Sequence, residues 1–395
     1  MKQIKRYRSV WRNIMIAVIS MCLAFKAVLP IYAAPQDETV VPALSLNCPS
    51  AVLMEASTGT VLFEQNPDAV CPPASITKIM TLLLVMEAVD SGVLKLDDRV
   101  TASAHAASMG GSQVYLKEGE SMTVEDMIKS VVISSANDAA LALAEHLCGT
   151  EEAFVAEMNK KATELGMKKT NFENTNGLDD TVENHVTTAR DVALMSQALI
   201  KHDLILKYSS IWMDTIRDGA FGLTNTNRLV RFYPGATGLK TGSTAKAKFC
   251  ISATAERNGM SLICVIMGAE TRDVRNEEAK KLLDWGFANF ELYSAPQVVL
   301  DPMHIRGGVV DECEISLLPF SCVVKKGTAA AVAVTYDIVS DLPAPITEGQ
   351  SVGTATYRSG EEILGQTDIC TKMAVEKISF GGLFSRMFRY FVGKY

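Results

Sequence analysis

The chain has 395 residues, of which 48% are hydrophobic and 21% charged, and its formal net charge is −7. This length predicts two or three domains, and the apolar fraction excludes an intrinsically disordered chain. The acidic balance argues against a nucleic-acid partner. The 26 glycines and 13 prolines follow no period, which excludes a collagen-like chain.

Residues 1–33 have the pattern of a secretory signal peptide. Residues 2–12 contain five basic side chains and no acidic one, residues 14–25 carry no charge, and small residues follow at Ala33 and Ala34. The apolar run is shorter than the ~20 residues of a spanning helix, so cleavage after Ala33 is favoured over a retained anchor. Cleavage removes six positive charges and leaves a net charge of −13. We expect an exported protein at the outer face of the cytoplasmic membrane or in the cell wall.

The residues after the signal predict an α+β domain over residues 45–293. A hairpin is expected over residues 50–65, and a helix over 75–89 is apolar on nearly every face, which places it in the centre of a domain. Further helices are expected over 123–132, after a break at 134–137 as far as residue 147, over 188–201 and over 277–290, and strands over 238–242, 248–255 and 260–267. This succession indicates an antiparallel sheet with helices packed on its faces.

The last hundred residues change in character. Residues 298–375 contain short β-rich runs (309–317, 329–339 and 351–357) between Gly, Pro and Asp signals, which predicts a small all-β domain. Residues 378–395 place apolar side chains on one helical stripe, and their only charges are Arg386, Arg389 and Lys394. This pattern is typical of an amphipathic helix on a membrane surface, with docking on the protein itself as the alternative.

A first candidate for chemistry is Ser75 with Lys78, because three residues along a helix separate side chains that share one face. A hydroxyl becomes a good nucleophile when a neighbour accepts its proton, and a neutral amine does so when burial and nearby positive charge lower its pKa. Lys78 lies in an otherwise apolar helix, where an unpaired charge is costly.

Two further segments carry suitable polar groups. Ser135 and Asn137 lie in a break between helices, where they either interrupt the helix by bonding to the backbone or relay protons and orient a substrate amide. Lys240 and Thr241 lie on a predicted strand, where a cation and a hydroxyl would hold a carboxylate, and Gly242 allows close backbone approach. A lysine that protects a strand edge is the alternative interpretation.

The order and spacing of these motifs are specific. Ser-x-x-Lys, Ser-x-Asn about 60 residues later and Lys-Thr-Gly about 105 residues further form the three-motif set of penicillin-recognising serine enzymes. Residues 73–81, 116–120, 135–140 and 235–242 resemble the D-alanyl-D-alanine carboxypeptidases, the low-molecular-mass penicillin-binding proteins. The likeness extends over nearly the whole mature chain, with its β-domain and amphipathic tail, and the signal peptide also looks like that of this family.

This resemblance implies a role for each motif residue. Ser75 would attack the D-Ala–D-Ala bond, with Lys78 as general base and Ser135 as proton relay. Asn137 would position the substrate. Lys240 and Thr241 would meet its terminal carboxylate beside Gly242, and Arg275, which matches a family arginine, would aid the binding of that carboxylate. The backbone N–H groups of Ser75 and Ser243 would form the oxyanion hole. The implied partners are peptidoglycan stem peptides and covalent β-lactam inhibitors.

No metal or other cofactor is expected. The five histidines show no ligand spacing, and the eight cysteines after the signal indicate neither a disulfide framework nor a zinc site. Three alternatives stay open: a β-lactamase, for which Glu183 is the nearest deacylating carboxylate by position, a transpeptidase, and a non-catalytic wall-binding module.

Overall fold

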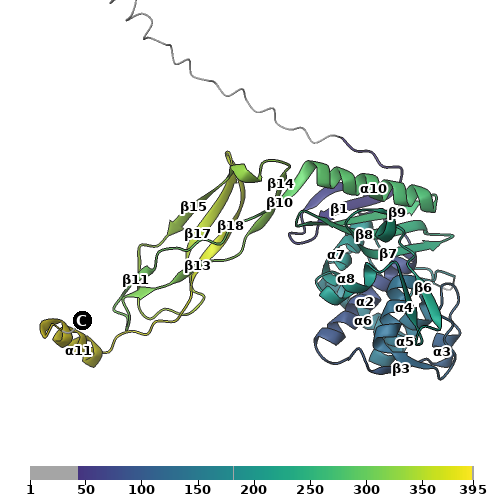
Figure 1. Ribbon diagram of the computed structural model, residues 1–395, viewed down its shortest axis with the longest axis horizontal. Coiled ribbons are helices and arrows are strands. Elements are labelled where there is room, and N and C mark those ends of the chain that lie inside the picture. Colours follow the sequence, from purple (N-terminus) through teal and green to yellow (C-terminus); the bar gives the residue numbers. More distant parts are fainter. Residues whose placement is uncertain (1–42, 181, 394–395) are drawn as a thin grey trace, which may run out of the picture. The chain divides into compact units, whose positions relative to one another are not determined.

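The computed structural model describes residues 43–180 and 182–393, so the predicted signal peptide lies outside the described residues. A five-stranded antiparallel sheet has the order β2-β1-β9-β8-β7, which brings the first strand of the chain beside a much later hairpin (Figure 1). Its strands are β1 (Ser50–Glu55), β2 (Val61–Gln65), β7 (Ala236–Thr244), β8 (Lys248–Arg257) and β9 (Met260–Ala269).

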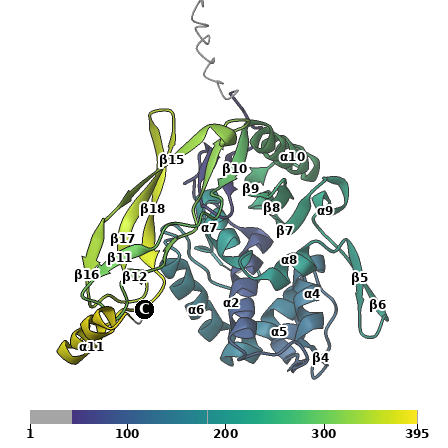
Figure 2. The ribbon, with the colours of Figure 1, turned by 60° about the vertical axis from the view of Figure 1, so that its left-hand side comes forward.

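Helices cover both faces of this sheet, so the predicted antiparallel sheet with packed helices is confirmed (Figure 2). Side chains alternate between the faces along β1: Val52 and Met54 join a core with helices α2, α4, α5 and α7, whereas Ala51 and Leu53 join a core with α10. The helices are α2 (Lys78–Asp90), α3 (Ala104–Ala107), α4 (Val124–Ser134), α5 (Asn137–Cys148), α6 (Glu151–Glu164), α7 (Ala189–Leu199), α8 (Asp203–Ser209), α9 (Leu229–Phe232) and α10 (Arg272–Asn289).

Hydroxyl caps explain several helix starts. Thr123 begins α4 and Thr188 begins α7, each accepting a hydrogen bond from the amide three residues later, as the sequence predicted. The predicted start of the helix over 277–290 is wrong, because α10 begins five residues earlier at Arg272, with Thr271 as its cap. Ser75 also does not begin an α-helix: it lies in a 3₁₀ turn, η1 (Ala74–Thr77), and α2 follows at Lys78. Two short hairpins complete this part, β3 (Arg99–Thr101) with β4 (Ser121–Thr123) and β5 (Met213–Ile216) with β6 (Phe221–Thr224).

The β-rich segment contains three small sheets and one short 3₁₀ turn, η2 (Ala329–Ala331). Its largest sheet has the order β13-β18-β17-β15, beside β12-β11-β16 and the pair β10-β14. The predicted run over residues 309–317 is broken into β12 and β13, and the sequence analysis missed β18. The bounds are β10 (Phe290–Ser294), β11 (Met303–Arg306), β12 (Glu312–Cys313), β13 (Ile315–Leu317), β14 (Ser321–Lys325), β15 (Val332–Ile338), β16 (Asp341–Pro343), β17 (Ser351–Ser359) and β18 (Glu362–Thr371).

The predicted terminal helix is present as α11 (Phe380–Phe391), and Ser379 caps it through the amide of Gly382. None of its residues is buried. Within the described ranges, no helix combines the length and the apolar character that crossing a membrane requires. The eight cysteines that the structure describes are free thiols.

Candidate active site

Ser75 and Lys78 face each other across the junction of η1 and α2. The half-buried Ser75 hydroxyl Oγ lies 3.0 Å from Nζ of the fully buried Lys78. Lys78 Nζ also donates a hydrogen bond to the carbonyl oxygen of Asn176, at 2.7 Å. A neutral amine held in this way can accept the serine proton, which is the first requirement for a nucleophilic hydroxyl.

Burial lowers the pKa of Lys78 well below its usual 10.5, because a charged amine loses its hydration there. The positive charge of Lys240 lowers the pKa of Lys78 further, whereas the negative charge of Asp138 opposes the shift. The environment therefore favours the neutral form of Lys78 that a general base requires.

The residue before Asn176 is held in place by a carboxylate on the neighbouring helix α6. Glu151 Oε1 accepts hydrogen bonds from the backbone N–H of Thr175 at 2.9 Å and from its hydroxyl at 2.8 Å. The carbonyl of the same residue accepts a bond from the hydroxyl of Thr81 on α2, at 2.6 Å. Thr175 is thus fixed through its N–H, its hydroxyl and its carbonyl, directly before the residue whose carbonyl meets Lys78.

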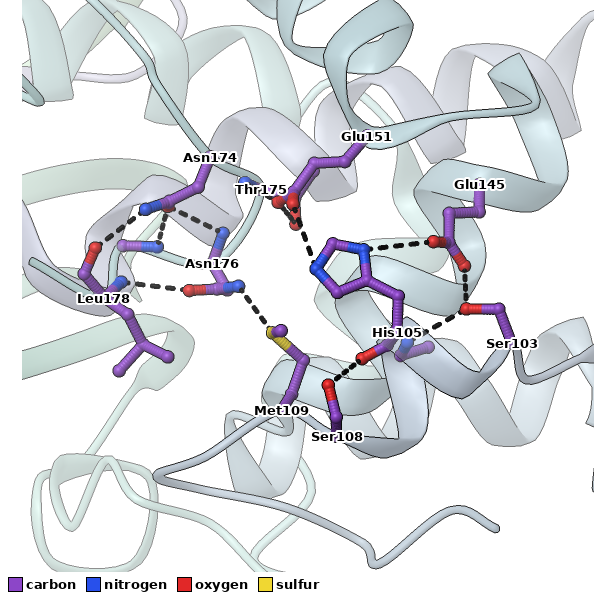
Figure 3. Close-up of polar contacts among 12 residues, drawn as sticks. Ser103, His105, Ser108, Met109, Glu145, Glu151, Asn174, Thr175, Asn176 and Leu178 are labelled. Carbon is purple, nitrogen blue, oxygen red and sulfur yellow. Dashed lines mark hydrogen bonds and ion pairs between the residues drawn. The ribbon is translucent and has the colours of Figure 1, made fainter. Parts of the chain in front are cut away.

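Figure 3 shows a second connection to the same carboxylate. His105 of α3 lies between two acidic side chains, with Nδ1 3.4 Å from Glu145 and Nε2 4.0 Å from Glu151. Met109 lies four residues further along the chain, and its Sδ accepts a bond from the Asn176 amide at 3.6 Å. The segment that follows α3 and the 174–178 loop are therefore joined beside Lys78.

Ser135 and Lys240 form the second half of the site. Lys240 Nζ donates to Ser135 Oγ at 2.8 Å and to the carbonyl of Thr241 at 2.8 Å. Ser135 ends α4 in the left-handed region, with φ 62° and ψ 30°, which is unfavourable for a residue with a side chain and points to a functional constraint. Burial and, to a smaller extent, the nearby charge of Arg275 together lower the pKa of Lys240 to about 7.

The Asn137 amide is anchored on one side only. Its Nδ2 donates to the carbonyl of Gly110 at 2.7 Å, whereas the buried Oδ1 has no hydrogen-bond partner among the described residues. An acceptor left unpaired in this way is costly unless a ligand satisfies it. Asn137 thus offers an oxygen for an incoming N–H group.

The strand β7 carries the third motif close to Ser75. Thr241 Oγ1 donates to the hydroxyl of Thr226 at 2.8 Å. A Cβ atom on Gly242 would lie 2.9 Å from the amide nitrogen of Ser75 and 3.0 Å from the carbonyl oxygen of Pro73, so only glycine allows this approach. The exposed Ser243 follows at the cavity wall, and the buried Arg275 of α10 donates to the side chain of Asn276.

A cavity of about 720 Å³ opens on these groups. Its lining includes Ser75, Ser135, Thr241, Gly242, Ser243 and Arg275, so residues more than 190 positions apart in the chain meet at one hollow. Lys78 and Lys240 lie beneath this wall, each touching a lining hydroxyl. The site thus combines a nucleophile (Ser75), a base (Lys78) and a cation that can bind an anion (Lys240). This combination fits acyl transfer on a substrate that ends in a carboxylate.

Comparison with known proteins agrees with this geometry. Residues 36–271 match the model of the D-alanyl-D-alanine carboxypeptidase family. The chain belongs to this family. Residues 287–377 match the C-terminal domain of penicillin-binding protein 5, which confirms the predicted α+β enzyme fold followed by an all-β domain. The predicted penicillin-binding carboxypeptidase is therefore confirmed at the level of the family.

The similarity to known relatives extends over most of the carboxypeptidase chain. It is 42% identical to the D-alanyl-D-alanine carboxypeptidase DacF of Bacillus subtilis over 88% of this chain and 90% of that protein. It is 33% identical to DacC of Escherichia coli, over 91% of each chain. The crystal structure of penicillin binding protein 5 from Haemophilus influenzae matches 85% of this chain and all of that one, at 31% identity and a TM-score of 0.75. Penicillin-binding protein D2 of Listeria monocytogenes, in an ampicillin-bound form, matches 62% of this chain and all of that one, at 36% identity and a TM-score of 0.57.

Two side chains outside the predicted site support the turn that carries Ser75. The buried His185 accepts a bond from the amide of Glu173 at Nδ1, which leaves the proton on Nε2, 2.7 Å from Thr77 Oγ1. Thr77 in turn donates to the carbonyl of Ala74, so this pair supports the turn that carries Ser75. Burial lowers the pKa of His185 to about 4, which keeps it neutral in that role. Glu183 is exposed and does not line the cavity.

Proposed function

We propose that this carboxypeptidase removes the terminal D-alanine of peptidoglycan stem pentapeptides through an acyl-enzyme on Ser75. The observation that carries the proposal is the contact of 3.0 Å between Ser75 Oγ and the amine of Lys78, whose pKa is lowered by burial and by Lys240. Lys78 takes the hydroxyl proton as Oγ bonds to the scissile carbonyl carbon. The backbone N–H groups of Ser75 and Ser243 stabilise the resulting oxyanion.

The other motif residues then protonate the leaving group and bind the two parts of the substrate. The C–N bond breaks as the proton reaches the departing amine through Ser135, which contacts Lys240 at 2.8 Å. Lys240, Thr241 and Arg275 hold the terminal carboxylate, and Gly242 lets the substrate strand lie against β7. The unpaired Oδ1 of Asn137 accepts an N–H of the peptide. Water releases the shortened peptide from Ser75.

The test is the release of D-alanine from diacetyl-L-lysyl-D-alanyl-D-alanine. Hydrolysis should dominate, and an added amine acceptor should not divert most of the acyl group, as it would in a transpeptidase. The penicilloyl adduct should persist for minutes, because Glu183 is exposed and lies outside the cavity lining. Turnover of penicillin within milliseconds would instead indicate a β-lactamase, and no hydrolysis or adduct at all would indicate a non-catalytic wall-binding module.

Glu151 should act as a positioning residue for Lys78. Glu151→Ala removes both bonds to Thr175 and frees the carbonyl that orients the lysine amine, so acylation by penicillin should fall about 10-fold. Glu151→Gln keeps an acceptor oxygen and should recover part of the rate. The pH profile distinguishes this role from a general loss of stability: we expect the acid limb of the acylation rate to move in Glu151→Ala. An unchanged pH profile would leave Glu151 with a structural role only.

We further propose that residues 378–395 hold the exported enzyme on the outer surface of a membrane, where its substrate and β-lactam inhibitors reach it. The apolar stripe of α11 is exposed, with Phe380 at 86% and Phe384 at 65%, which argues against docking on the protein itself. Arg386 is bound to Asp311 at 2.5 Å and to the carbonyl of Val309, so the positive charge of this side chain is paired within the protein. Such a helix binds an interface through its apolar face.

Phe384→Ser combined with Phe388→Ser should therefore reduce binding to anionic phospholipid vesicles at least 10-fold, because each phenylalanine contributes about 1.5–3 kcal/mol when it leaves water. Vesicle flotation measures the bound fraction, and release of D-alanine should be unchanged. The matched control is Met373→Ser, an exposed apolar residue outside α11. Equal binding by the double variant and the control would contradict the membrane role of this helix.

A further inference from the structure

The loop that joins β11 to β12 presents an apolar tip. Residues 307–311 have the sequence Gly-Gly-Val-Val-Asp, and the side chains of Val309 and Val310 are 49% and 40% exposed. A single exposed valine is common on protein surfaces, but two adjacent ones at a turn form a small apolar patch. The core of the β-domain is built from other side chains, among them Met303 and Ile305 of the preceding strand. The two valines are thus left outside the core of their own domain.

The backbone of this loop is fixed against the segment that leads into α11. The N–H of Val309 donates to the carbonyl of Glu376 at 2.9 Å, and the N–H of Ile378 donates to the carbonyl of Gly307 at 2.9 Å. Gly307 has a φ of +68°, in the left-handed region that glycine adopts without strain. Because the loop is held in this way, its apolar tip stays in a fixed position beside the start of the terminal helix.

Arg386 joins the loop to α11 itself. Its guanidinium donates to the carboxylate of Asp311 at 2.5 Å, to the carbonyl of Gly308 at 3.1 Å and to the carbonyl of Val309 at 2.7 Å. A planar guanidinium with three acceptors is fixed in orientation as well as in position. The pair with Asp311 also balances the one acidic side chain of this loop, so the loop adds no net negative charge next to an anionic bilayer.

The position of Arg386 along the helix places the loop at the edge of the apolar stripe. Leu383 belongs to this stripe and precedes Arg386 by three residues, so the two side chains are neighbours on one flank of α11. Arg389 instead follows Phe380 by nine residues, which at about 100° per residue puts it on the face opposite the stripe. The loop therefore contacts the helix beside its apolar stripe, and the two exposed valines extend this apolar surface onto the β-domain.

We propose that the 307–311 loop is a second membrane contact, in which Val309 and Val310 enter the interface of a lipid bilayer beside α11. This inference rests on the proposed membrane role of α11 and extends that role to the β-domain. The occupant is a bilayer because the patch is continuous with the helix face already assigned to the bilayer. Arg386 holds helix and loop together as one surface. A helix alone leaves the β-domain free to rotate about the helix axis, whereas a second contact fixes the orientation of this domain on the membrane.

The first test measures binding of the mature chain to vesicles of phosphatidylcholine and phosphatidylglycerol by flotation. Val309→Ser combined with Val310→Ser should reduce binding about 5-fold or more, because two apolar side chains no longer leave water. Ile363→Ser is the matched control, since Ile363 is 52% exposed and lies at the opposite end of β18 from the segment that leads to α11. This control should bind within about twofold of the wild-type protein.

The second test locates the loop directly and does not depend on a loss of binding. Val310→Trp places an indole at the tip, and lipids brominated on their acyl chains should quench its fluorescence beyond the wild-type signal, whereas Ile363→Trp should give no added quenching. Arg386→Gln combined with Val310→Trp should reduce this quenching, because the loop is no longer bound to the helix. Arg389→Gln removes a cation from the same helix and should reduce the quenching less. Equal quenching in the two arginine variants would contradict the role of Arg386.

The outcomes separate this contact from the role of α11. Wild-type binding by the double valine variant, or an indole in Val310→Trp that stays unquenched on bound vesicles, would overturn the loop contact. Phe384→Ser combined with Phe388→Ser should lose binding in either case. If this phenylalanine variant binds like the wild-type protein, the result contradicts the proposed membrane role of α11 instead. Unchanged thermal unfolding and release of D-alanine show that each variant is folded.

Discussion

Lys78→Met is expected to slow the acylation of Ser75 by about 10²–10⁴-fold, the range that a general base contributes. Methionine fills nearly the same volume without an amine, so the buried α2 helix should remain packed. Removal of a buried amine should also raise the melting temperature, because desolvation makes that amine costly. Stopped-flow measurement of penicillin acylation, with thermal unfolding alongside, tests both statements.

Lys78→Arg is the matched variant, because a guanidinium retains its charge and does not act as a base at neutral pH. It should be as inactive as Lys78→Met, although it keeps a cation near Ser75. Acylation by either variant within about threefold of the wild-type rate would show that another group takes the serine proton.

Lys240→Met should have the second largest effect, with a fall of about 10²-fold or more in kcat/KM for the D-Ala–D-Ala peptide. The variant loses the buried cation proposed to meet the substrate carboxylate, and truncation of such a partner is costly. It also leaves Ser135 Oγ without its contact at 2.8 Å. Lys240→Arg keeps the charge but not the compact amine, and it should recover only part of the loss.

The same variant has a distinct signature in the pH profile. Lys78 acts as a neutral base, so acylation falls as the pH drops through its pKa. The charge of Lys240 contributes to lowering that pKa, and its removal should move the acid limb of the profile to higher pH. The pKa of Lys240 itself is about 7, so its loss of charge should weaken carboxylate binding as the pH rises, and this alkaline limb should disappear in the variant. The acid and alkaline limbs of the pH profile reflect the titration of the Lys78 and Lys240 amines as a coupled pair. If Lys240→Met lowers the acylation rate equally at every pH, without moving either limb, the result would contradict this coupling.

The sequence was most informative where chemistry depends on side chains at short spacing. Ser75 and Lys78 are three residues apart, so any helical turn brings them together, although the structure has a 3₁₀ turn at Ser75. The apolar surroundings of Lys78 in the sequence already predicted its burial. Thr123 and Thr188 were recognised as helix caps because their signal is a local pattern. The start of α10 was missed, because the charged residues after Thr271 hide the helical periodicity that begins there.

What the sequence did not reveal depends on backbone groups and on long-range packing. The carbonyl of Asn176 holds the amine of Lys78, and a carbonyl is present at every position of a chain. Glu151 and His185 act through this backbone and through a turn hydroxyl, so their types alone carried no signal. Arg228 and Arg272 precede and follow the β7–β9 strands, and only the fold brings them to one cavity. Contacts of this kind can be identified only from the three-dimensional structure.

The central claim is that Ser75 is the residue that becomes acylated. Intact-protein mass spectrometry after incubation with penicillin G, followed by peptide mapping, measures this directly. We predict a gain of one penicilloyl group, located on the peptide that contains Ser75, and no gain in Ser75→Ala. A penicilloyl group on a different residue, or undiminished labelling of Ser75→Ala, would contradict the account.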